Sequence, residues 1–271
     1  MPFFRKNGYV VVRALFDDEE MKLVQAVCQS DPNLAVSLKT VVDNTEHTWG
    51  ASVWTGLNDS LVSAITRTAR MVEIAETIAG GECYHMYSKI VQKPPHDKSI
   101  VRWHQAFPSW YDDGVPFPDK ATDCSIAVTE NTKANGCLQV IEKSHLLGRI
   151  DRIEIGNTVE SDPKHIERAL RDLKIVDCEM DIGDTVFFHP NTVHGSQQNT
   201  TDNTRILMHC HYNAMSNRPF AEGLEAHSCL PLEKLPDSAI KDGIYTIGFD
   251  PNAKDWNWYN KDPEEYLKAI A

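Results

Sequence analysis

The chain has 271 residues, of which 41% are hydrophobic and 24% are charged, the composition of an ordinary globular protein. Its formal net charge is −12 and no basic stripe is visible, so no nucleic-acid partner is expected. No apolar run approaches the roughly 20 residues of a membrane helix. The N-terminus lacks an apolar core followed by a small-residue cleavage site, so neither a membrane partner nor a secretory signal is expected.

The seven cysteines are odd in number, widely spaced and free of any CxxC pair. This pattern argues against a disulfide framework and against a structural zinc site. Reduced thiols in a cytoplasmic protein are therefore the expectation.

The first 83 residues are predicted to be mainly helical. Asp17 is a candidate N-cap with Glu20 three residues later, and Phe16 and Met21 are placed for a hydrophobic staple. Apolar residues recur at helical spacing from Asp59 to Ala79, which predicts one helix that stops at the following pair of glycines.

From Tyr84 onward the pattern changes to short strands separated by turn residues. We predict strands at Tyr84–Val91, Ser99–His104, Ser125–Thr129, Cys137–Ile141, Ile175–Glu179, Thr185–His189 and Arg205–Tyr212. One helix interrupts them, capped by Asp162 with Pro163 at its first position, and continues to about Leu173.

These elements predict a mainly β fold with flanking helices, of the sandwich or barrel type, in a single domain 1–271. The helical part is 1–83, the β core is 84–214, and the C-terminal segment is 215–271. This last segment is irregular and rich in Pro, Asp and Asn, so it is expected to pack over the core or over the mouth of a site.

Two of the eleven histidines are candidate metal ligands because of their position. His104 follows one predicted strand, and His194 follows another strand and the turn Pro190-Asn191. Strand ends at a barrel mouth can bring distant residues together. Arg205 comes eleven residues after His194 and is predicted to lie on the adjacent strand, where an arginine can grip a carboxylate bidentately.

This combination resembles the phytanoyl-CoA dioxygenase family of iron- and 2-oxoglutarate-dependent oxygenases. The resemblance spans about residues 3–212. The matching segments are FFRKNGYVVVRALF at 3–16, WHQAF at 103–107, NGCLQVIEKSH at 135–145, GDTVFFHPNTVHGS at 183–196, and Arg205.

The resemblance implies a double-stranded β-helix, Fe(II) as metal, and 2-oxoglutarate and O2 as co-substrates. It carries over His104 and His194 as iron ligands and Arg205 as the residue that holds the distal carboxylate of 2-oxoglutarate. Lys93 or Gln92 is implied to touch the co-substrate as well. Asn135, Gly136, His145 and His189, which lie in the same segments, are expected to be structural.

One departure from the family pattern concerns the third ligand. Family members usually read His-x-Asp, giving two histidines and a carboxylate, whereas this chain reads His104-Gln105-Ala106. Alanine cannot bind a metal, so one coordination position is open and one negative charge is missing. Chloride would restore both, which is the pattern of the iron- and 2-oxoglutarate-dependent halogenases that His-x-Ala resembles. Ala106 is thereby a candidate catalytic-site position, with chlorine placed on an unactivated C–H bond.

Two other functions stay open. The chain is also compatible with a hydroxylase that carries an aspartate-to-alanine substitution at 106, or with a binding protein that has lost catalysis. No HExxH, GxxxxGK[ST], GxGxxG or GxSxG pattern occurs, which argues against zinc hydrolases, P-loop and dinucleotide-binding proteins, and serine hydrolases.

The substrate is expected to be a small molecule such as an amino acid, a nucleotide or an alkaloid-like compound. Trp49, Trp110, Tyr111 and Phe117 are candidate pocket residues. The loop-like segment Phe107–Lys120 directly follows the first histidine and is a candidate lid.

Overall fold

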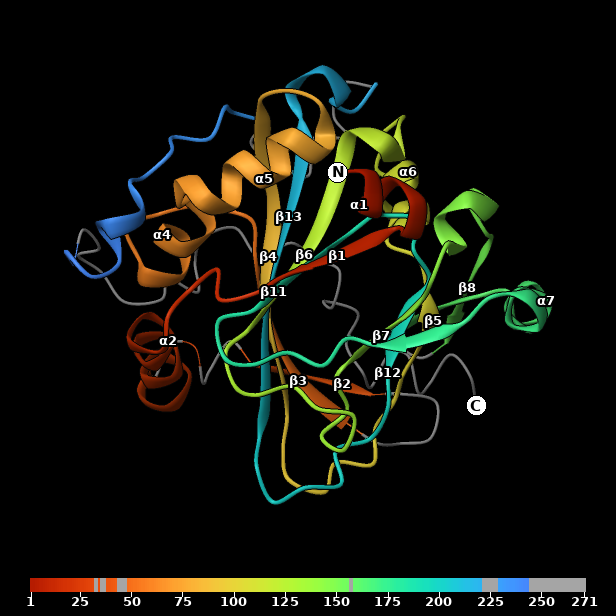
Figure 1. The fold of residues 1–271 in the computed structure, drawn as a ribbon, viewed down its shortest axis with the longest axis horizontal. Coiled ribbons are helices and arrows are strands. Elements are labelled where there is room, and N and C mark those ends of the chain that lie inside the picture. Colours follow the sequence, from red (N-terminus) through yellow and green to blue (C-terminus); the bar gives the residue numbers. More distant parts are fainter. Residues whose placement is uncertain (32–33, 35–37, 43–47, 156–157, 221–228, 244–271) are drawn as a thin grey trace.

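A large antiparallel sheet forms the centre of the molecule (Figure 1). The computed structural model describes residues 1–31, 34, 38–42, 48–155, 158–220 and 229–243. In sheet order the strands are β1 (Tyr9–Val12), β11 (Thr185–Phe188), β6 (Ala121–Ala127), β13 (Arg205–Ala214), β4 (Cys83–Lys93), β3 (Thr48–Trp54) and β2 (Lys39–Val42). Three of these strands come from the part of the chain predicted to be mainly helical, so 1–83 also extends the sheet.

A smaller antiparallel sheet faces the large one. Its strands in order are β10 (Ile175–Asp177), β7 (Leu138–Ile141), β12 (His194–Ser196) and β5 (Val101–His104). Leu138 and Val140 of this sheet pack with Val186 and Leu207 of the large sheet, so the two inner faces share a core. A hairpin of β8 (Arg152–Ile155) and β9 (Thr158–Ser161) lies beside β5. The two facing sheets confirm the predicted mainly β fold with flanking helices.

Helices cover the outer face of the large sheet (Figure 1). They are α2 (Asp18–Ser30), α4 (Leu61–Arg67) and α5 (Ala69–Ala79). Their apolar residues, including Val24, Ile65 and Val72, form one core with Ile90 and Met208 of the sheet. The other helices are α1 (Pro2–Asn7), α6 (Phe107–Asp112) and α7 (Pro163–Asp172), with 3-10 turns η1 (Pro118–Lys120), η2 (Ser144–Leu147), η3 (Met215–Asn217) and η4 (Asp237–Ala239).

Side chains of strand β13 point alternately into the core under the helices and into a cavity between the two sheets. Side chains alternate along a strand, so Ile206, Met208 and Cys210 join the core under the helices. Arg205 and His209, which are out of phase with them, line a cavity between the two sheets. The strand is buried along its whole length.

The predicted helix Asp59–Ala79 is two helices, because Thr68 is extended with φ −57° and ψ 141°. Its hydroxyl donates to the Ile65 carbonyl at 2.9 Å, and Leu235 pairs with Thr68 as an isolated bridge. A β-branched residue with a local hydroxyl bond competes with the helical ladder. The predicted stop is confirmed, since Gly80 adopts the left-handed conformation with φ +77°.

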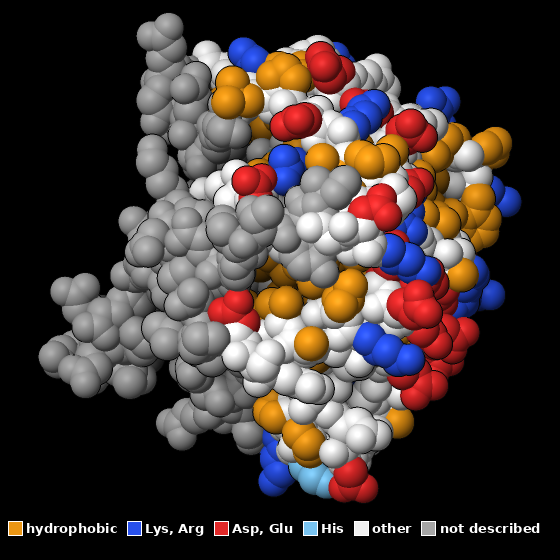
Figure 2. Space-filling view, turned by 90° about the vertical axis from the view of Figure 1, so that its left-hand side faces the viewer, with side chains coloured by type: hydrophobic (Ala, Val, Ile, Leu, Met, Phe, Trp, Pro, Cys, Tyr) orange, Lys and Arg blue, Asp and Glu red, His pale blue; other side chains and the backbone are white. Residues whose placement is uncertain are grey.

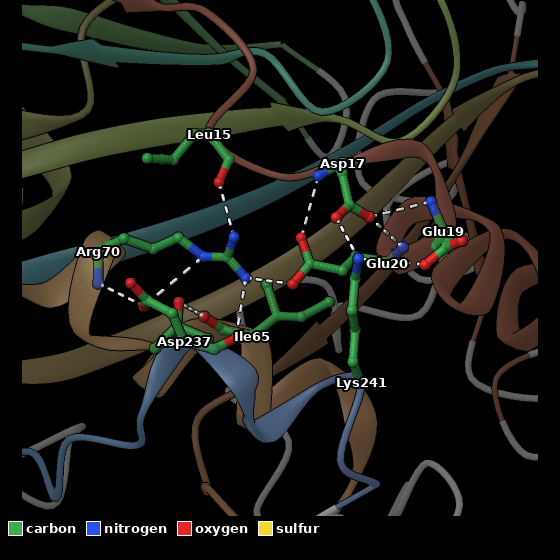
Figure 3. A network of polar contacts seen from close by, with 9 residues as sticks. Leu15, Asp17, Glu19, Glu20, Ile65, Arg70, Asp237 and Lys241 are labelled. Carbon is green, nitrogen blue, oxygen red and sulfur yellow. Dashed lines mark hydrogen bonds and ion pairs between the residues drawn. The ribbon is translucent and has the colours of Figure 1, made fainter.

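The N-terminus of α2 is capped as predicted, and a polar network joins it to the C-terminal segment (Figure 3). The Asp17 side chain accepts from the backbone of Glu20, whose own side chain accepts from the Asp17 backbone. The buried Glu20 carboxylate pairs with Arg70 of α5, which also bonds the Leu15 carbonyl at 2.9 Å. Lys241 reaches Asp17 at 2.5 Å, so residues after β13 are fastened to the helical layer.

One face of the molecule carries acidic and basic side chains close together, with hydrophobic side chains near its centre (Figure 2). None of the helices in the described residues is long and apolar enough to cross a membrane. All seven cysteines carry free thiols. Residues 244–271, the end of the C-terminal segment expected to cover the core or a site, lie outside the described residues.

Candidate active site

His104 and His194 lie directly opposite each other in the small sheet. His104 is the last residue of β5, His194 is the first residue of β12, and the two are register partners. Their ring centroids are 4.1 Å apart. The pairing of two strands therefore brings together side chains that are 90 residues apart in the sequence. The distance between the two rings is compatible with two ligands of one ion.

Backbone carbonyls fix the orientation of both rings. Nδ1 of His104 bonds the Arg102 carbonyl at 2.8 Å, and Nδ1 of His194 bonds the Thr192 carbonyl at 2.9 Å. A carbonyl only accepts, so each Nδ1 carries the proton and Nε2 keeps its lone pair. Metal-binding histidines are typically held in this way through the other ring nitrogen.

Both imidazoles are neutral near neutral pH. Desolvation in the cavity lowers the pKa of His104 to about 4. Desolvation also lowers the pKa of His194, and the neighbouring His104 lowers it further. A metal competes with protons for the ring nitrogen, so these lowered pKa values favour metal binding.

The turn after His104 directs Ala106 into the same cavity. The Gln105 side chain turns away to the adjacent loops, where it accepts from the Ile150 amide at 2.7 Å and donates to the Asn191 carbonyl at 2.7 Å. The Ala106 amide donates to the Pro190 carbonyl at 3.1 Å. Both His104 and Ala106 line the cavity, so a carboxylate at 106 would face the space beside the histidine pair.

Glycine allows close packing next to the second histidine. A Cβ atom on Gly195 would lie 2.6 Å from the Val101 carbonyl oxygen of β5, closer than any side chain tolerates. Gly136 has φ +74°, and a Cβ there would lie 2.3 Å from the Gln197 carbonyl. The positive φ of Gly136 agrees with its expected structural role. The absence of a side chain lets the loop before β7 lie against the chain that follows β12.

The sequence predicted Arg205 on the strand next to His194. In the structure Arg205 is instead buried in the opposing sheet. It begins β13 of the large sheet, whereas β12 is flanked by β5 and β7. The residue is 2% exposed, and its Nε atom is buried without a hydrogen-bond partner. Desolvation lowers the pKa of the guanidinium to about 10, so it stays charged at neutral pH. A buried arginine with an unused donor is suited to an anionic ligand.

Lys93 and Gln92 lie on β4 opposite the start of β13 but are not among the residues that line the cavity. The Lys93 ammonium donates to the carbonyls of Ser99 at 2.9 Å and Gln197 at 2.5 Å. It therefore joins two loops, and its geometry gives no support to the co-substrate contact that the resemblance implied. Lys89, four residues earlier on the same strand, does line the cavity.

Several polar cavity residues were not singled out from the sequence. Among them are Lys89, Asp123, His209 and His211. His209 and His211 are in phase with Arg205 on β13, so period-two alternation from a known inward residue would have found them. Lys89 and Asp123 come from the strands on either side, and no local pattern distinguishes them from surface charges.

Of the predicted aromatic pocket residues, two line the cavity and two do not. Trp49 and Trp110 line it and are buried, whereas Tyr111 and Phe117 are 42% and 56% exposed. The segment predicted as a loop-like lid contains helix α6, whose buried Trp110 forms part of the cavity wall. His145 and His189 lie outside the cavity lining; His145 bonds the Arg5 carbonyl at 3.0 Å and His189 bonds Asp119 at 2.9 Å.

The histidine pair on one sheet and the buried arginine on the other line one cavity between the two facing sheets. The model of the phytanoyl-CoA dioxygenase family matches residues 4–207. Ectoine dioxygenase of Stutzerimonas stutzeri (strain A1501) is 30% identical over 243 residues, which cover 81% of this chain and 78% of that protein. L-proline trans-4-hydroxylase of Streptomyces griseoviridis is 28% identical over 177 residues, covering 59% of this chain and 66% of that protein.

A solved structure has the same fold. EctD from S. alaskensis with 2-oxoglutarate and 5-hydroxyectoine superimposes with a TM-score of 0.66 at 25% identity, covering 81% of this chain and 78% of that chain. The chain therefore belongs to the phytanoyl-CoA dioxygenase family. It is an Fe(II)/2-oxoglutarate-dependent oxidoreductase with a cupin-like β fold.

Proposed function

We propose that this protein is an Fe(II)/2-oxoglutarate-dependent halogenase that places chlorine on an unactivated C–H bond of a small molecule. The observation that carries the proposal is Ala106. Its methyl group lies in the cavity beside the histidine pair, where the family pattern has a carboxylate. Within the part of the chain that the structure describes, no three His, Cys, Asp or Glu side chains are grouped closely enough to hold a metal.

The residues present fit the metal and the co-substrate. His104 and His194 would hold Fe(II) through Nε2, because a carbonyl occupies each Nδ1. Arg205 would hold the distal carboxylate of 2-oxoglutarate, which would satisfy its unused buried Nε. When bound, iron, 2-oxoglutarate and O2 supply the oxidising chemistry. The protein contributes orientation and the exclusion of water.

The charge balance favours a halide at the open position. Fe(II) and dianionic 2-oxoglutarate sum to zero, whereas a family member with an aspartate at this position reaches −1. Chloride beside Ala106 restores that charge and completes the coordination that the methyl group leaves open. An alanine side chain also leaves the room that a halide needs, which an aspartate would fill.

Hydroxylation is the second candidate, and the names of the relatives favour it. The similar proteins are described as an ectoine dioxygenase and a proline hydroxylase. In that case Ala106 would be a substitution within a hydroxylase site. A protein without catalysis would consume no 2-oxoglutarate.

Chloride dependence tests the proposal. In anaerobic titrations, chloride should tighten 2-oxoglutarate binding by about tenfold, because the two anions complete one coordination shell. Sodium methanesulfonate at the same ionic strength is the control for screening. With O2 present, succinate release should require chloride and products should carry chlorine by mass. No chloride effect on binding or turnover would refute the halogenase proposal and leave hydroxylation.

The role of Arg205 is tested separately. Arg205→Lys keeps the charge but loses the planar fork, so 2-oxoglutarate affinity should fall by about tenfold, and by about 30-fold or more in Arg205→Ala. Arg102→Lys is the matched control, since Arg102 also lines the cavity but pairs with Glu160 at 3.7 Å. Calorimetry under anaerobic conditions measures the 2-oxoglutarate affinity of each variant. Equal affinity in Arg205→Ala and the native protein would exclude this assignment.

A further inference from the structure

Three polar side chains in the cavity have no part in holding iron or 2-oxoglutarate in the function proposed above. Lys89 lies on β4, His211 on β13 and Asp123 on β6. These strands are neighbours in the large sheet; His211 pairs with Asp123 on one side and with Tyr87, two residues before Lys89, on the other. The three side chains therefore form one continuous polar area of the cavity wall.

Lys89 makes no direct contact with an anionic side chain of the described residues, although the charge of Asp123 acts on it. Its ammonium has neither a hydrogen bond nor an ion pair with any residue that the structure describes, although Arg102 and Lys93 nearby are both engaged. Desolvation lowers the pKa of Lys89, and the charge of Asp123 opposes that shift. A half-buried ammonium costs free energy unless an anion accompanies it. The Lys89 ammonium is therefore suited to bind a negatively charged group of a ligand.

Asp123 and His211 together offer two unused acceptors. His211 Nδ1 donates to Asp123 Oδ1, because a carboxylate only accepts. In the neutral ring Nε2 is then an acceptor, and Asp123 Oδ2 is a second one. Both residues are at most 2% exposed, and both atoms lack a hydrogen-bond partner. Buried acceptors are normally satisfied, so a ligand with hydroxyl or amino donors fits them.

Aromatic packing holds the pair in place. The Tyr87 ring stacks on His211 with centroids 4.0 Å apart, and Trp110 meets His211 edge-on at 5.7 Å. The Trp110 indole also donates to the Tyr87 hydroxyl at 3.3 Å. The acceptors are therefore presented on a rigid wall, as a specificity site requires.

Arg205 and Lys89 stand at different positions along the large sheet, and neither side chain has a hydrogen bond or ion pair with a residue that the structure describes. Arg205 pairs with Lys93, and Lys89 is four residues further along β4. At about 3.3 Å per residue the backbones of the two positions are about 13 Å apart along the strand, so the two cations are suited to two separate anionic groups. Arg205 is assigned to 2-oxoglutarate, so Lys89 is left for a second anion.

We propose that Lys89, Asp123 and His211 form the substrate subsite, and that the substrate is a small carboxylate or phosphate that also carries hydroxyl or amino groups. Lys89 pairs with the anionic group, and the two acceptors receive the donors. This inference rests on the proposed function in that it reserves Arg205 and the histidine pair for 2-oxoglutarate and iron.

Binding without turnover tests the subsite. The Fe(II)–2-oxoglutarate form is titrated without O2 with 3-hydroxybutyrate and glycerol 3-phosphate, with their neutral counterparts 3-hydroxybutyramide and glycerol, and with butyrate, which lacks the hydroxyl. The readouts are calorimetry and the visible charge-transfer absorption of the iron complex. At least one hydroxylated anion should bind about tenfold more tightly than its neutral counterpart. Which of the two binds distinguishes a carboxylate from a phosphate substrate.

Variants assign the effect to residues. Lys89→Met should weaken that anion by about tenfold and leave 2-oxoglutarate affinity within about twofold. Lys98→Met removes an exposed lysine charge and is the matched control. Asp123→Asn should weaken the hydroxylated anion by about fivefold more than butyrate, because it removes one acceptor. Thermal unfolding checks that each variant is folded.

Several outcomes would overturn the inference. One is that neither anion binds better than its neutral counterpart. Another is that Lys89→Met lowers 2-oxoglutarate affinity by about tenfold or abolishes the chloride effect, which would assign Lys89 to the co-substrate or the halide. Equal losses for butyrate and 3-hydroxybutyrate in Asp123→Asn would remove the donor contact. None of these titrations requires halogenation, so a failed chloride test and a failed subsite are distinguishable.

Discussion

Replacing His194 with alanine is expected to abolish Fe(II) binding at micromolar concentrations. In the proposed site two side chains, His104 and His194, would hold the metal. Changes to the partners of a metal ligand already cost about 10–100-fold in affinity, so loss of a ligand itself should cost at least about 100-fold. Anaerobic titration with Fe(II), followed by metal analysis of the desalted protein, measures the loss.

His189→Ala is the matched control for His194→Ala. The two histidines are similarly buried, at 6% and 8% exposure, and both follow strand β11 in the chain. His189 bonds Asp119 and does not line the cavity, so its loss should leave iron affinity within about twofold. Iron binding by His194→Ala that matches the native protein would place the metal elsewhere and refute the proposed centre.

The pKa of His104 adds a pH dependence to this prediction. This pKa of about 4 lies below the ordinary histidine value of 6.5, so the ring stays neutral as pH falls from 8 to about 5. Proton competition for this ligand therefore begins only near pH 4. Iron affinity is expected to be nearly constant above pH 6, which titrations at several pH values would measure.

Local signals in the sequence were sufficient for the elements that depend on neighbouring residues. The capping box of Asp17 and Glu20, the stop at Gly80 and the cap of α7 at Asp162 are all present in the structure. Each depends on residues within four positions of one another, so composition and spacing record it directly. The break at Thr68 was missed because it is held partly by Leu235, far along the chain.

The site needed information that spacing alone does not hold. Arg205 follows His194 by eleven positions, which indicated neighbouring strands, but the chain crosses to the opposite sheet. Lys93 matched the resemblance, yet its ammonium is taken by two backbone carbonyls, and Lys89 faces the cavity instead. The register between β4, β13 and β6 decides which charges meet, and register is a property of the paired strands and not of any one segment.

Restoring the family carboxylate by Ala106→Asp is expected to change the reaction outcome. The new side chain would face the space beside His104 and His194, where it can complete a facial triad. It would occupy the halide position and add a negative charge, so chloride should no longer tighten 2-oxoglutarate binding. Ala106 directly precedes α6 and lines the cavity, so an aspartate side chain has open space beside it and the variant is expected to fold.

Two further substitutions separate charge from volume at this position. Ala106→Gly keeps the space open and should keep the chloride effect, whereas Ala106→Asn fills the space without adding charge and should lose most of it. If the protein is a halogenase, products of the native protein and of Ala106→Gly carry chlorine, and any remaining activity of Ala106→Asp is hydroxylation.

If it is a hydroxylase with a substituted site, Ala106→Asp should raise succinate release sharply, and chloride should have no effect before the change. Product mass and succinate release, with and without chloride for all four proteins, decide between these outcomes. A chloride effect that persists unchanged in Ala106→Asp would show that the halide does not bind beside residue 106, because an aspartate cannot share that position with a second anion.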